Sequence, residues 1–241
     1  MAPPELLSIL VPVYNEASTV ATVIGRLRTI SLPIAREILV IDDGSTDGTA
    51  EVLDAEAARD AALQVIHAGR NRGKGAAIRL GLARARGTII AIQDADLELD
   101  PAQLAGLVEP ILRGETRVVY GSRFLAGRPA APWITIVANR MLTSVTNALY
   151  GSRLTDMETC YKIMRADVAN GLALESDRFD IEPEITAKLL RAGHGILERP
   201  VHYEPRRREH GKKIKWRDGL HALGVLVRYR VNARRTASSG S

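Results

Sequence analysis

Two aspartates lie two residues apart where an apolar stretch ends. Asp94 and Asp96 follow residues 88–93, and Glu98 comes two residues later. Because side chains two apart on an extended segment point to the same side, Asp94 and Asp96 can hold a hard divalent cation, with Glu98 completing the set. Such a cation keeps open positions for a substrate diphosphate, so we expect Mg²⁺ or Mn²⁺. The alternative is that these acids only cap the helix that opens at Pro101.

A second acidic cluster, residues 42–47, follows another apolar stretch. After a parallel strand, a carboxylate can accept hydrogen bonds from ribose hydroxyls or from a base edge. We therefore assign Asp42 and Asp43 to a ligand and residues 45–47 to capping of the next helix. Glu16 has a weaker case, since an acid at a helix start is common without any ligand.

The segment 69–75 is rich in glycine, arginine and lysine. It fails the Walker pattern because only three residues separate Gly69 from Gly73, and it fails the dinucleotide fingerprint because Ile78 stands where the third glycine belongs. What remains is a flexible cationic loop, including Lys74, before a helix N-terminus. Such a loop is suited to an anion.

Short apolar strands and intervening helices must position these residues. Their alternation, with helices of about 10 to 15 residues, implies right-handed crossovers and a mostly parallel sheet. In such a sheet the ligand binds beyond the carboxyl ends of the strands, where the polar clusters gather. The predicted strands are residues 7–13, 37–41, 63–67, 88–93 and 161–164, and the predicted helices are residues 17–29, 49–59, 76–86, 133–149 and 183–191.

Composition fits one soluble α/β unit. The 241 residues are 46% hydrophobic and 25% charged. No run reaches the roughly 18 uninterrupted apolar residues of a membrane-spanning helix, so we expect neither secretion nor membrane spanning. Cys160 is the single cysteine, which excludes an internal disulfide and fits a reducing cytoplasmic compartment. The five histidines are scattered, and we assign them no role.

Positive charge is concentrated near the C-terminus. Residues 206–235 contain eleven Lys or Arg against two acids, whereas the whole chain has a net charge of +5. This asymmetry indicates an anionic partner: nucleic acid, a phosphorylated substrate or an anionic membrane surface. We expect a mobile basic loop at residues 206–215 that closes over a diphosphate, and a disordered tail at residues 236–241.

Apolar residues recur at helical spacing between residues 216 and 231, flanked by Lys and Arg. This pattern predicts a basic amphipathic helix at residues 218–235. Such a helix either lies on an anionic membrane as a peripheral contact or packs on the core as an ordinary helix.

Four motifs, in this order, resemble the inverting glycosyltransferase family 2. They are Pro12-Val-Tyr-Asn-Glu16, Ile41-Asp-Asp-Gly-Ser-Thr-Asp47, Arg70-Asn-Arg-Gly-Lys74 and Asp94-Ala-Asp96. The resemblance covers about residues 5–217. It implies an α/β protein of GT-A fold, with a Rossmann-like, mostly parallel central sheet flanked by helices. We therefore expect residues 1–217 to form one GT-A catalytic domain.

Within that family, further motifs look most like the polyprenyl-phosphate sugar synthases, such as dolichyl-phosphate mannose and glucose synthases. These motifs are Gln93-Asp-Ala-Asp-Leu-Glu98, Val119-Tyr-Gly-Ser-Arg123, Asn139-Arg140 with Ser144, Thr155-Asp-Met-Glu-Thr-Cys-Tyr-Lys162 and Phe179-x-Ile-Glu-Pro-Glu184. The resemblance implies that the nucleotide sugar contacts Pro12, Tyr14, Glu16, Asp42, Asp43, Lys74, Gln93, Asp94, Ala95 and Asp96. It implies that Asp94, Asp96 and Glu98 hold the metal, and that Arg123, Arg140 and Ser144 receive the acceptor phosphate. The implied catalytic set is Asp94, Asp96, Arg123 and Arg140.

The resemblance implies an inverting, metal-dependent transferase that moves a hexose, mannose or glucose, from a nucleotide diphosphate sugar to a polyprenyl phosphate at the cytoplasmic membrane face. A lipid phosphate is already an anion, so it needs no general base once cationic side chains position it. The alternative for Arg123 and Arg140 is surface solvation or a structural ion pair. The donor base and sugar stay open, because pocket shape decides them.

Two alternative functions remain. A soluble hydroxyl acceptor needs a general base, a role for Asp156, Glu158 or Glu182. A nucleic-acid-binding module would use the basic C-terminal segment. However, the aromatic residues make up only 4% of the chain and leave little for base stacking, and no binding motif is present, so we expect no nucleic acid.

Overall fold

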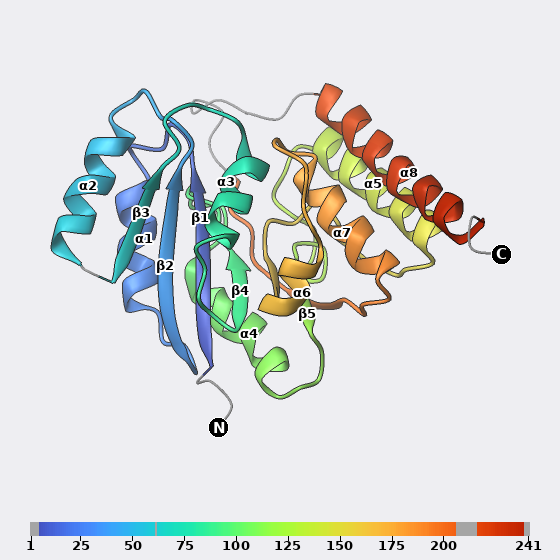
Figure 1. Ribbon diagram of the computed structural model, residues 1–241, viewed down its shortest axis with the longest axis horizontal. Helices are drawn as coiled ribbons and strands as arrows, with labels where there is room; N and C mark the ends of the chain where they lie inside the picture. The colour runs from blue at the N-terminus through green and yellow to red at the C-terminus, as the bar shows by residue number, and fades with distance from the viewer. Residues whose placement is uncertain (1–4, 61, 206–215, 239–241) are drawn as a thin grey trace.

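A seven-stranded mixed sheet forms the centre of the protein (Figure 1). The structure, a computed structural model, describes residues 5–60, 62–205 and 216–238. The strand order is β3-β2-β1-β4-β6-β5-β7. The strands are β1 (Leu6–Val13), β2 (Ala35–Asp42), β3 (Leu63–His67), β4 (Ile89–Ile92), β5 (Val118–Ser122), β6 (Lys162–Arg165) and β7 (Leu197–Pro200). Only β6 runs antiparallel to its neighbours, β4 and β5, so the expectation of a mostly parallel sheet is confirmed.

Helices separate most of the strands along the chain. They are α1 (Val20–Thr29), α2 (Thr49–Arg59), α3 (Lys74–Leu82), α4 (Leu104–Leu112), α5 (Trp133–Tyr150), α6 (Ala166–Gly171), α7 (Ile181–Arg191) and α8 (Trp216–Ser238), and a 3₁₀ turn, Pro101–Gln103, precedes α4. Four helix starts differ from the prediction, and two of them, α7 at Ile181 and α8 at Trp216, come two residues earlier than expected. Residues 17–19 form a turn before α1, and α3 begins at Lys74, because the chain becomes helical directly after Gly73.

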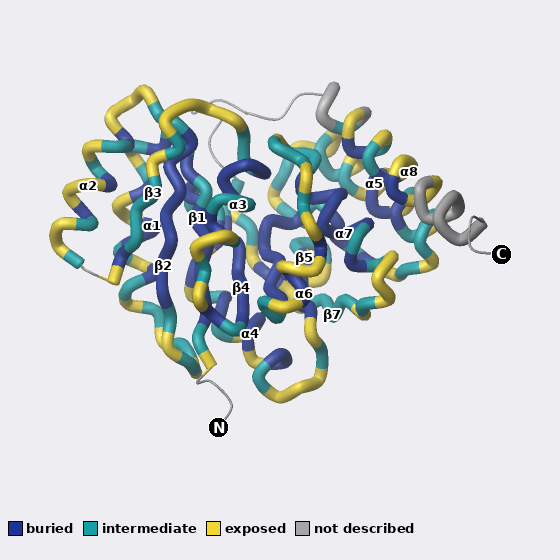
Figure 2. Tube along the Cα trace, in the orientation of Figure 1, coloured by how far each residue is buried: buried dark blue, intermediate teal, exposed yellow. Residues whose placement is uncertain are grey.

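The central strands are buried along most of their length (Figure 2). In β1, Leu7, Ile9, Leu10 and Val11 have no exposed surface, and β4 is buried throughout. A continuous apolar run is what a parallel strand needs when helices cover both faces of its sheet. The same packing fixes the carboxyl ends of β1, β2 and β4 side by side, because these strands are adjacent and parallel.

The C-terminal helix α8 packs against α5 and α7 (Figure 1). Ala222, Leu226 and Tyr229 are buried in a hydrophobic cluster with side chains of α5 and α7. Val227 and Val231, which belong to the apolar residues expected at helical spacing, are exposed instead of packed on the core. Within its described side chains, α8 therefore has one apolar stripe packed on the protein body and a second that faces outward.

Some expectations fall at the edge of the described ranges. Helix α8 extends to Ser238, so residues 236–238 are helical and not disordered, and residues 239–241 lie outside the described residues. The basic loop expected at residues 206–215 also lies outside them. Within the described part of the chain, no helix combines the length and the apolar character needed to cross a bilayer.

Candidate active site

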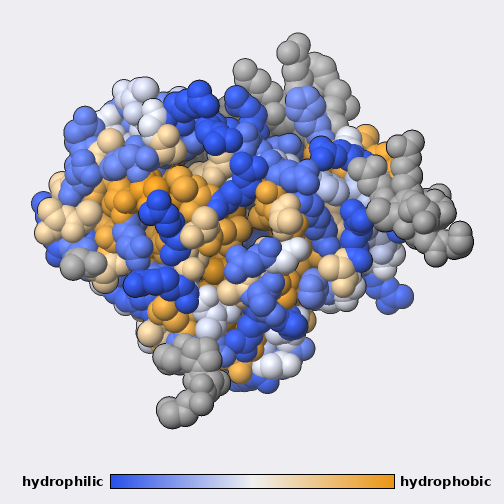
Figure 3. All heavy atoms as spheres, viewed as in Figure 1, coloured by the Kyte–Doolittle hydropathy of each residue, from blue (hydrophilic) through white to orange (hydrophobic). Residues whose placement is uncertain are grey.

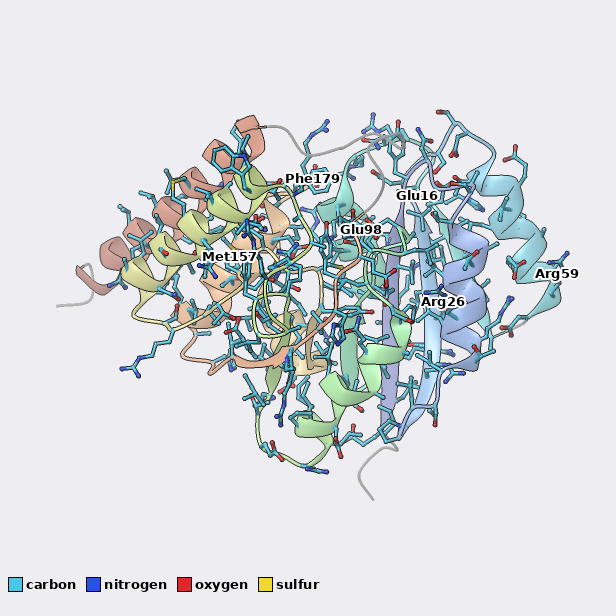
Figure 4. The ribbon with its side chains drawn as sticks, turned by 180° about the vertical axis from the view of Figure 1, so that it is seen from behind. Glu16, Arg26, Arg59, Glu98, Met157 and Phe179 are labelled. Atoms are coloured by element: carbon cyan, nitrogen blue, oxygen red, sulfur yellow. The ribbon has the colours of Figure 1, made fainter. Side chains whose placement is uncertain are left out.

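Polar loops gather at the carboxyl end of the sheet, as predicted. The acidic and basic clusters follow β1, β2, β3 and β4 directly. Hydrophilic side chains form much of the upper rim of the molecule above the ends of β1 to β3 (Figure 3). Glu16, after β1, and Glu98, after β4, both lie in this upper part (Figure 4).

Asp43 holds the glycine-rich loop. Its carboxylate accepts hydrogen bonds from the backbone N–H of Arg72 at 2.9 Å and of Gly73 at 2.6 Å. Burial is the largest influence on this carboxyl and raises its pKa. Gly73 has φ +110°, and a Cβ there would lie 2.5 Å from the carbonyl oxygen of Asp177. Asp43 thus holds in place the loop that precedes Lys74.

The Asp42 carboxylate has partners within the protein, and its assignment to a ligand stays a prediction. One oxygen accepts from the Ser45 N–H at 2.9 Å, and the other lies 3.0 Å from Nδ1 of His67. Nε2 of His67 lies 3.1 Å from Asp54. The hydrogen bond with Asp42, helped by Asp54, raises the pKa of His67. His67, to which the sequence assigned no role, therefore orients Asp42.

The end of β1 is tied to the loop after β4. Glu16 is buried, and its Oε2 lies 3.0 Å from Oγ1 of Thr19. The same hydroxyl lies 2.8 Å from the carbonyl oxygen of Ala95. Pro12 and Tyr14 are partly buried at the same end of β1. This contact brings the first and fourth sequence motifs together.

Gln93 lies beneath the β4 loop and is fully buried. Its Nε2 donates to the carbonyl oxygens of Asp94 at 3.0 Å and Leu99 at 3.2 Å, and its Oε1 accepts from the Tyr161 hydroxyl at 2.7 Å. These internal bonds engage both ends of the amide, and the expected contact of Gln93 with the donor stays a prediction. Gln93 braces the loop that carries the acids.

Four charged side chains of alternating sign form a chain through this region, which we call the buried charge chain: Asp94, Lys74, Glu182 and Lys162. Nζ of Lys74 lies 2.8 Å from Asp94 Oδ1 and 2.9 Å from Glu182 Oε1. The second oxygen of Glu182 accepts a short hydrogen bond from Lys162. Burial opposes the charge on Lys74, but Asp94 above all holds its pKa above the ordinary value. In turn, Lys74 outweighs burial and lowers the pKa of Asp94.

The three acids expected to hold a metal do not converge as a set. Across the residues that the structure describes, no three Asp, Glu, His or Cys side chains group closely enough to hold a metal ion. Asp94 faces Lys74, and Glu98 Oε2 accepts a hydrogen bond from the Tyr203 hydroxyl at 3.0 Å. Asp96 accepts the N–H of Glu98 at 3.1 Å. The carboxylates of Asp96 and Glu98 are still hard oxygen donors of the kind that Mg²⁺ and Mn²⁺ prefer.

Arg123 lies beside the acid loop but is engaged in an ion pair. Its Nε and Nη2 donate to the two oxygens of Asp156 at 2.7 and 2.8 Å, which is a bidentate arrangement. Its guanidinium stacks 5.4 Å from the ring centre of Tyr203, the residue that also binds Glu98. Arg123 therefore forms the structural ion pair that was stated as its alternative role. Because Tyr203 contacts both Arg123 and Glu98, the guanidinium lies next to the β4 loop.

Arg140 and Ser144 lie one turn apart on the exposed side of α5. The Arg140 guanidinium lies 5.3 Å from the ring centre of Phe124, the neighbour of Arg123 in sequence. Ser144 donates to the Arg140 carbonyl oxygen at 2.7 Å. Arg140 is thus an exposed cation near Arg123, whereas the Ser144 hydroxyl bonds to its own helix.

Glu158 has a buried carboxylate oxygen, Oε1, without a hydrogen-bond partner among the described residues. Burial raises the pKa of Glu158 to about 7. The preceding turn is fixed by Glu198 of β7, which accepts from the N–H groups of Thr155 and Asp156 at 2.8 and 2.9 Å.

Sequence reasoning missed His67, Tyr203 and Glu198 and gave Lys162 no role of its own. Lys162 had a usable signal, because it is the one charged residue of the predicted strand 161–164, and a buried lysine must find a partner. Tyr203 and Glu198 had none, because their partners come from segments about 43 to 105 residues away.

The geometry agrees with a comparison to known families. The model of the family described as glycosyl transferase family 2 matches residues 8–172, which include all four motifs. The chain belongs to glycosyltransferase family 2. The resemblance inferred from the motifs is confirmed, and the protein is a glycosyltransferase.

Two curated relatives of this glycosyltransferase are named for polyprenyl-phosphate acceptors. The chain is 32% identical to the undecaprenyl-phosphate mannosyltransferase of Micrococcus luteus, over 82% of this chain and 83% of that protein. It is 30% identical to the dodecaprenyl-phosphate galacturonate synthase of Rhizobium johnstonii, over 95% of this chain and 68% of that protein.

A solved structure shows the same fold. Glucosyl-3-phosphoglycerate synthase from Mycobacterium tuberculosis, in complex with UDP, has a TM-score of 0.72 and 20% identity, covering 95% of this chain and 81% of that chain. Other structures of that protein contain UDP with Mg²⁺, or UDP-glucose with Mn²⁺. The likeness confirms the GT-A fold expected for this glycosyltransferase.

Proposed function

We propose that this glycosyltransferase transfers a hexose, with inversion, from a nucleotide diphosphate sugar to a polyprenyl phosphate. The observation that carries the proposal is the meeting of two unlike sets of groups at one sheet edge. The acid loop after β4 lies next to Arg123 through Tyr203, and Arg140 follows on α5. The relatives named for polyprenyl-phosphate acceptors support the same acceptor class.

On the donor side, the proposed groups for the sugar nucleotide are Pro12, Tyr14 and Glu16 after β1, the loop held by Asp43, and Lys74. Lys74 is the first residue of α3, where the helix dipole adds positive potential and favours an anion such as a diphosphate. Asp96 and Glu98 would hold Mg²⁺ or Mn²⁺, which shields negative charge on a leaving diphosphate. Asp94 is balanced by Lys74.

On the acceptor side, an oxygen of the lipid phosphate attacks the anomeric carbon as the bond from that carbon to the donor's diphosphate breaks. The attacking oxygen is anionic, so no proton has to be removed. The chain has only to orient the phosphate, which is the role proposed for Arg123 and Arg140. Arg140 is exposed and available, and the Arg123 guanidinium is held rigidly by Asp156.

A membrane contact fits the position of the acceptor groups. The large apolar side chains that are exposed among the described residues all belong to the segment 125–141 and to α8; they are Leu125, Trp133, Ile134, Val137, Met141, Val227 and Val231. Helices α5 and α8 lie side by side (Figure 1). We call this set the apolar α5–α8 face. Arginines on α5 and α8 accompany it, which suits peripheral binding to an anionic bilayer at its cytoplasmic face.

The test is an extraction assay. The full chain is incubated with labelled GDP-mannose, UDP-glucose or another sugar nucleotide, Mn²⁺ and undecaprenyl phosphate in anionic vesicles. The proposal predicts label in an organic-extractable product that needs both the lipid phosphate and the metal. Label that appears only in water-soluble product, or full transfer in excess chelator, would contradict it.

Glu158 favours a second candidate, the same donor chemistry with a soluble hydroxyl acceptor. A carboxyl with a pKa of about 7 is well matched to act as a general base near neutral pH. This candidate predicts that Glu158→Gln abolishes transfer, whereas the polyprenyl-phosphate proposal predicts that transfer to lipid survives the change.

A further inference from the structure

Glu182 lies at the centre of the buried charge chain and has no role in the chemistry proposed above. Its side chain is almost completely buried, and each of its two oxygens faces a different lysine. Oε1 accepts no aligned hydrogen bond from any described residue, so its negative charge is balanced by the Lys74 ammonium at 2.9 Å. A buried carboxylate in this position is costly unless both cations stay in place.

Each lysine leads to a different half of the site. Lys74 continues to Asp94 at the end of β4, on the donor side. Lys162 is fully buried and donates to the carbonyl oxygens of Met157, at 3.1 Å, and Thr159. Met157 directly follows Asp156, which holds Arg123. One carboxylate therefore connects the donor lysine to the segment that supports the acceptor arginine.

We infer that Glu182 is a positioning residue that holds the Lys74 ammonium at the donor diphosphate site. Through Lys162, it also fixes the position of the segment 156–159, which supports Arg123, relative to Lys74. This inference rests on the proposed function. With Glu182 in place, Lys74 is drawn from two sides and stays between Asp94 and α7. Without the carboxylate, Lys74 is drawn to Asp94 alone, and Lys162 keeps only uncharged partners among the described residues: two carbonyl oxygens and the Tyr120 ring.

Glu184 provides a matched control on the same helix. It is equally buried and equally charged, but it accepts from the N–H groups of residues 175 and 176, from Lys188 and from the Tyr229 hydroxyl of α8. These partners hold α8 and the segment 175–176, whose backbone lies against Gly75, but Glu184 makes no contact with the Lys74 ammonium among the described residues. Glu184→Gln therefore reproduces the structural cost of neutralising a buried, paired carboxylate without touching Lys74.

The experiment measures binding of GDP and UDP with Mn²⁺ to the full chain by calorimetry, alongside thermal unfolding. Glu182→Gln is expected to weaken binding of the preferred nucleotide about tenfold, and Glu184→Gln less than about twofold at a comparable loss of Tm. Equal binding by wild type and Glu182→Gln, or equal weakening by both variants, would overturn the inference. If wild type itself binds neither nucleotide, the proposed function fails instead.

A double-mutant cycle with Lys74→Met tests whether Glu182 acts through that lysine. In the Lys74→Met background, Glu182→Gln is expected to change nucleotide affinity less than about twofold, because the positioned group is gone. If the fold-changes in nucleotide affinity of the two single variants multiply in the double variant, Glu182 acts independently of Lys74. That result would contradict the inference. Should Glu182→Gln fail to fold, Glu182→Asp keeps the charge and withdraws the carboxylate from Lys74. It is then expected to weaken nucleotide binding more than Glu184→Asp does.

Discussion

The proposed donor side and the proposed acceptor side of the site are built in opposite ways. On the donor side, the loops after β1, β2, β3 and β4 bond to one another: Asp43 holds the glycine-rich loop, His67 of β3 holds Asp42, and Thr19 joins the loop after β1 to the β4 loop. On the acceptor side, Arg140 and the apolar α5–α8 face are exposed. A set of polar loops bonded to one another suits a small polar donor, whereas an open, partly apolar surface suits an acceptor that remains in a bilayer.

Arg123 and Tyr203 stand at the boundary between the two sides. Tyr203 binds Glu98 through its hydroxyl and stacks on Arg123 through its ring, so it belongs to both. The contrast predicts that donor-side substitutions remove the reaction, and that acceptor-side substitutions change how the lipid is bound.

The largest effect is expected on the donor side. Asp96→Ala should lower transfer by about 10³-fold while the protein stays folded, because it removes a proposed metal ligand that supports the leaving diphosphate. The assay is initial-rate transfer at saturating Mn²⁺. The control is Asp100→Ala, which removes a cap of the 3₁₀ turn, costs about 1 kcal/mol of stability and should retain transfer. Near-normal transfer rates for Asp96→Ala would contradict the proposed role of Asp96 as a metal ligand.

Glu158, at the boundary, should reveal itself in the pH dependence of stability. Its pKa is raised in the folded protein to about 7, so the folded state binds a proton that the unfolded chain releases above about pH 4.5. Stability from this group is therefore lost as pH rises from about 4.5 to 7. Glu158→Gln should unfold at the same denaturant concentration as wild type at pH 4.5, and be more stable by up to about 3 kcal/mol at pH 8. A pH-independent difference would show that Glu158 titrates normally.

The apolar α5–α8 face should control membrane binding without affecting the donor. Ile134→Ser combined with Val137→Ser should weaken binding to anionic vesicles about 30-fold, because it removes two exposed aliphatic side chains worth about 1 kcal/mol each. Co-sedimentation measures this. Ala55→Ser with Ala58→Ser on α2, on the opposite side of the molecule, is the control and should bind normally (Figure 1). Equal vesicle binding by both pairs would place the membrane contact elsewhere.

The smallest effect is expected at Arg140. Arg140→Ala should raise the KM for polyprenyl phosphate about tenfold and leave nucleotide affinity unchanged, since this exposed cation contacts no donor loop. Stability should change by less than about 0.5 kcal/mol, because the side chain is exposed. Arg84→Ala, an exposed arginine just beyond the end of α3, serves as the control. A loss of nucleotide affinity in Arg140→Ala would contradict the assignment of Arg140 to the acceptor side.

The sequence was sufficient for the donor half of the fold. Apolar runs such as residues 7–13 and the polar residues that follow them depend on local pattern, and parallel strands bring such ends to one edge. The second half needed the structure. β5 ends in Gly121 and Ser122, and β7 contains Glu198 and Pro200, so neither has the continuous apolar pattern of β1.

The residues of the candidate site also divide into those that the sequence predicted and those that only the structure reveals. Asp94, Lys74 and Asp43 were found because each follows a strand, but their partners were not predictable. Gln93 and Asp42 were assigned to the ligand from residue type and position alone, which do not show the internal partners of a side chain. Among those partners, Tyr161 and His67 come from other segments of the chain.

The central claim is that the donor's diphosphate lies at the end of β4, between Lys74 and the acids of the following loop. A crystal structure of the full chain with Mn²⁺ and the nucleoside diphosphate that binds in calorimetry tests it most directly. We predict a manganese anomalous peak within coordination distance of the Asp96 carboxylate, with the diphosphate next to the Lys74 ammonium. A bound nucleotide with its manganese away from Asp96, or with its diphosphate away from Lys74, would contradict the account.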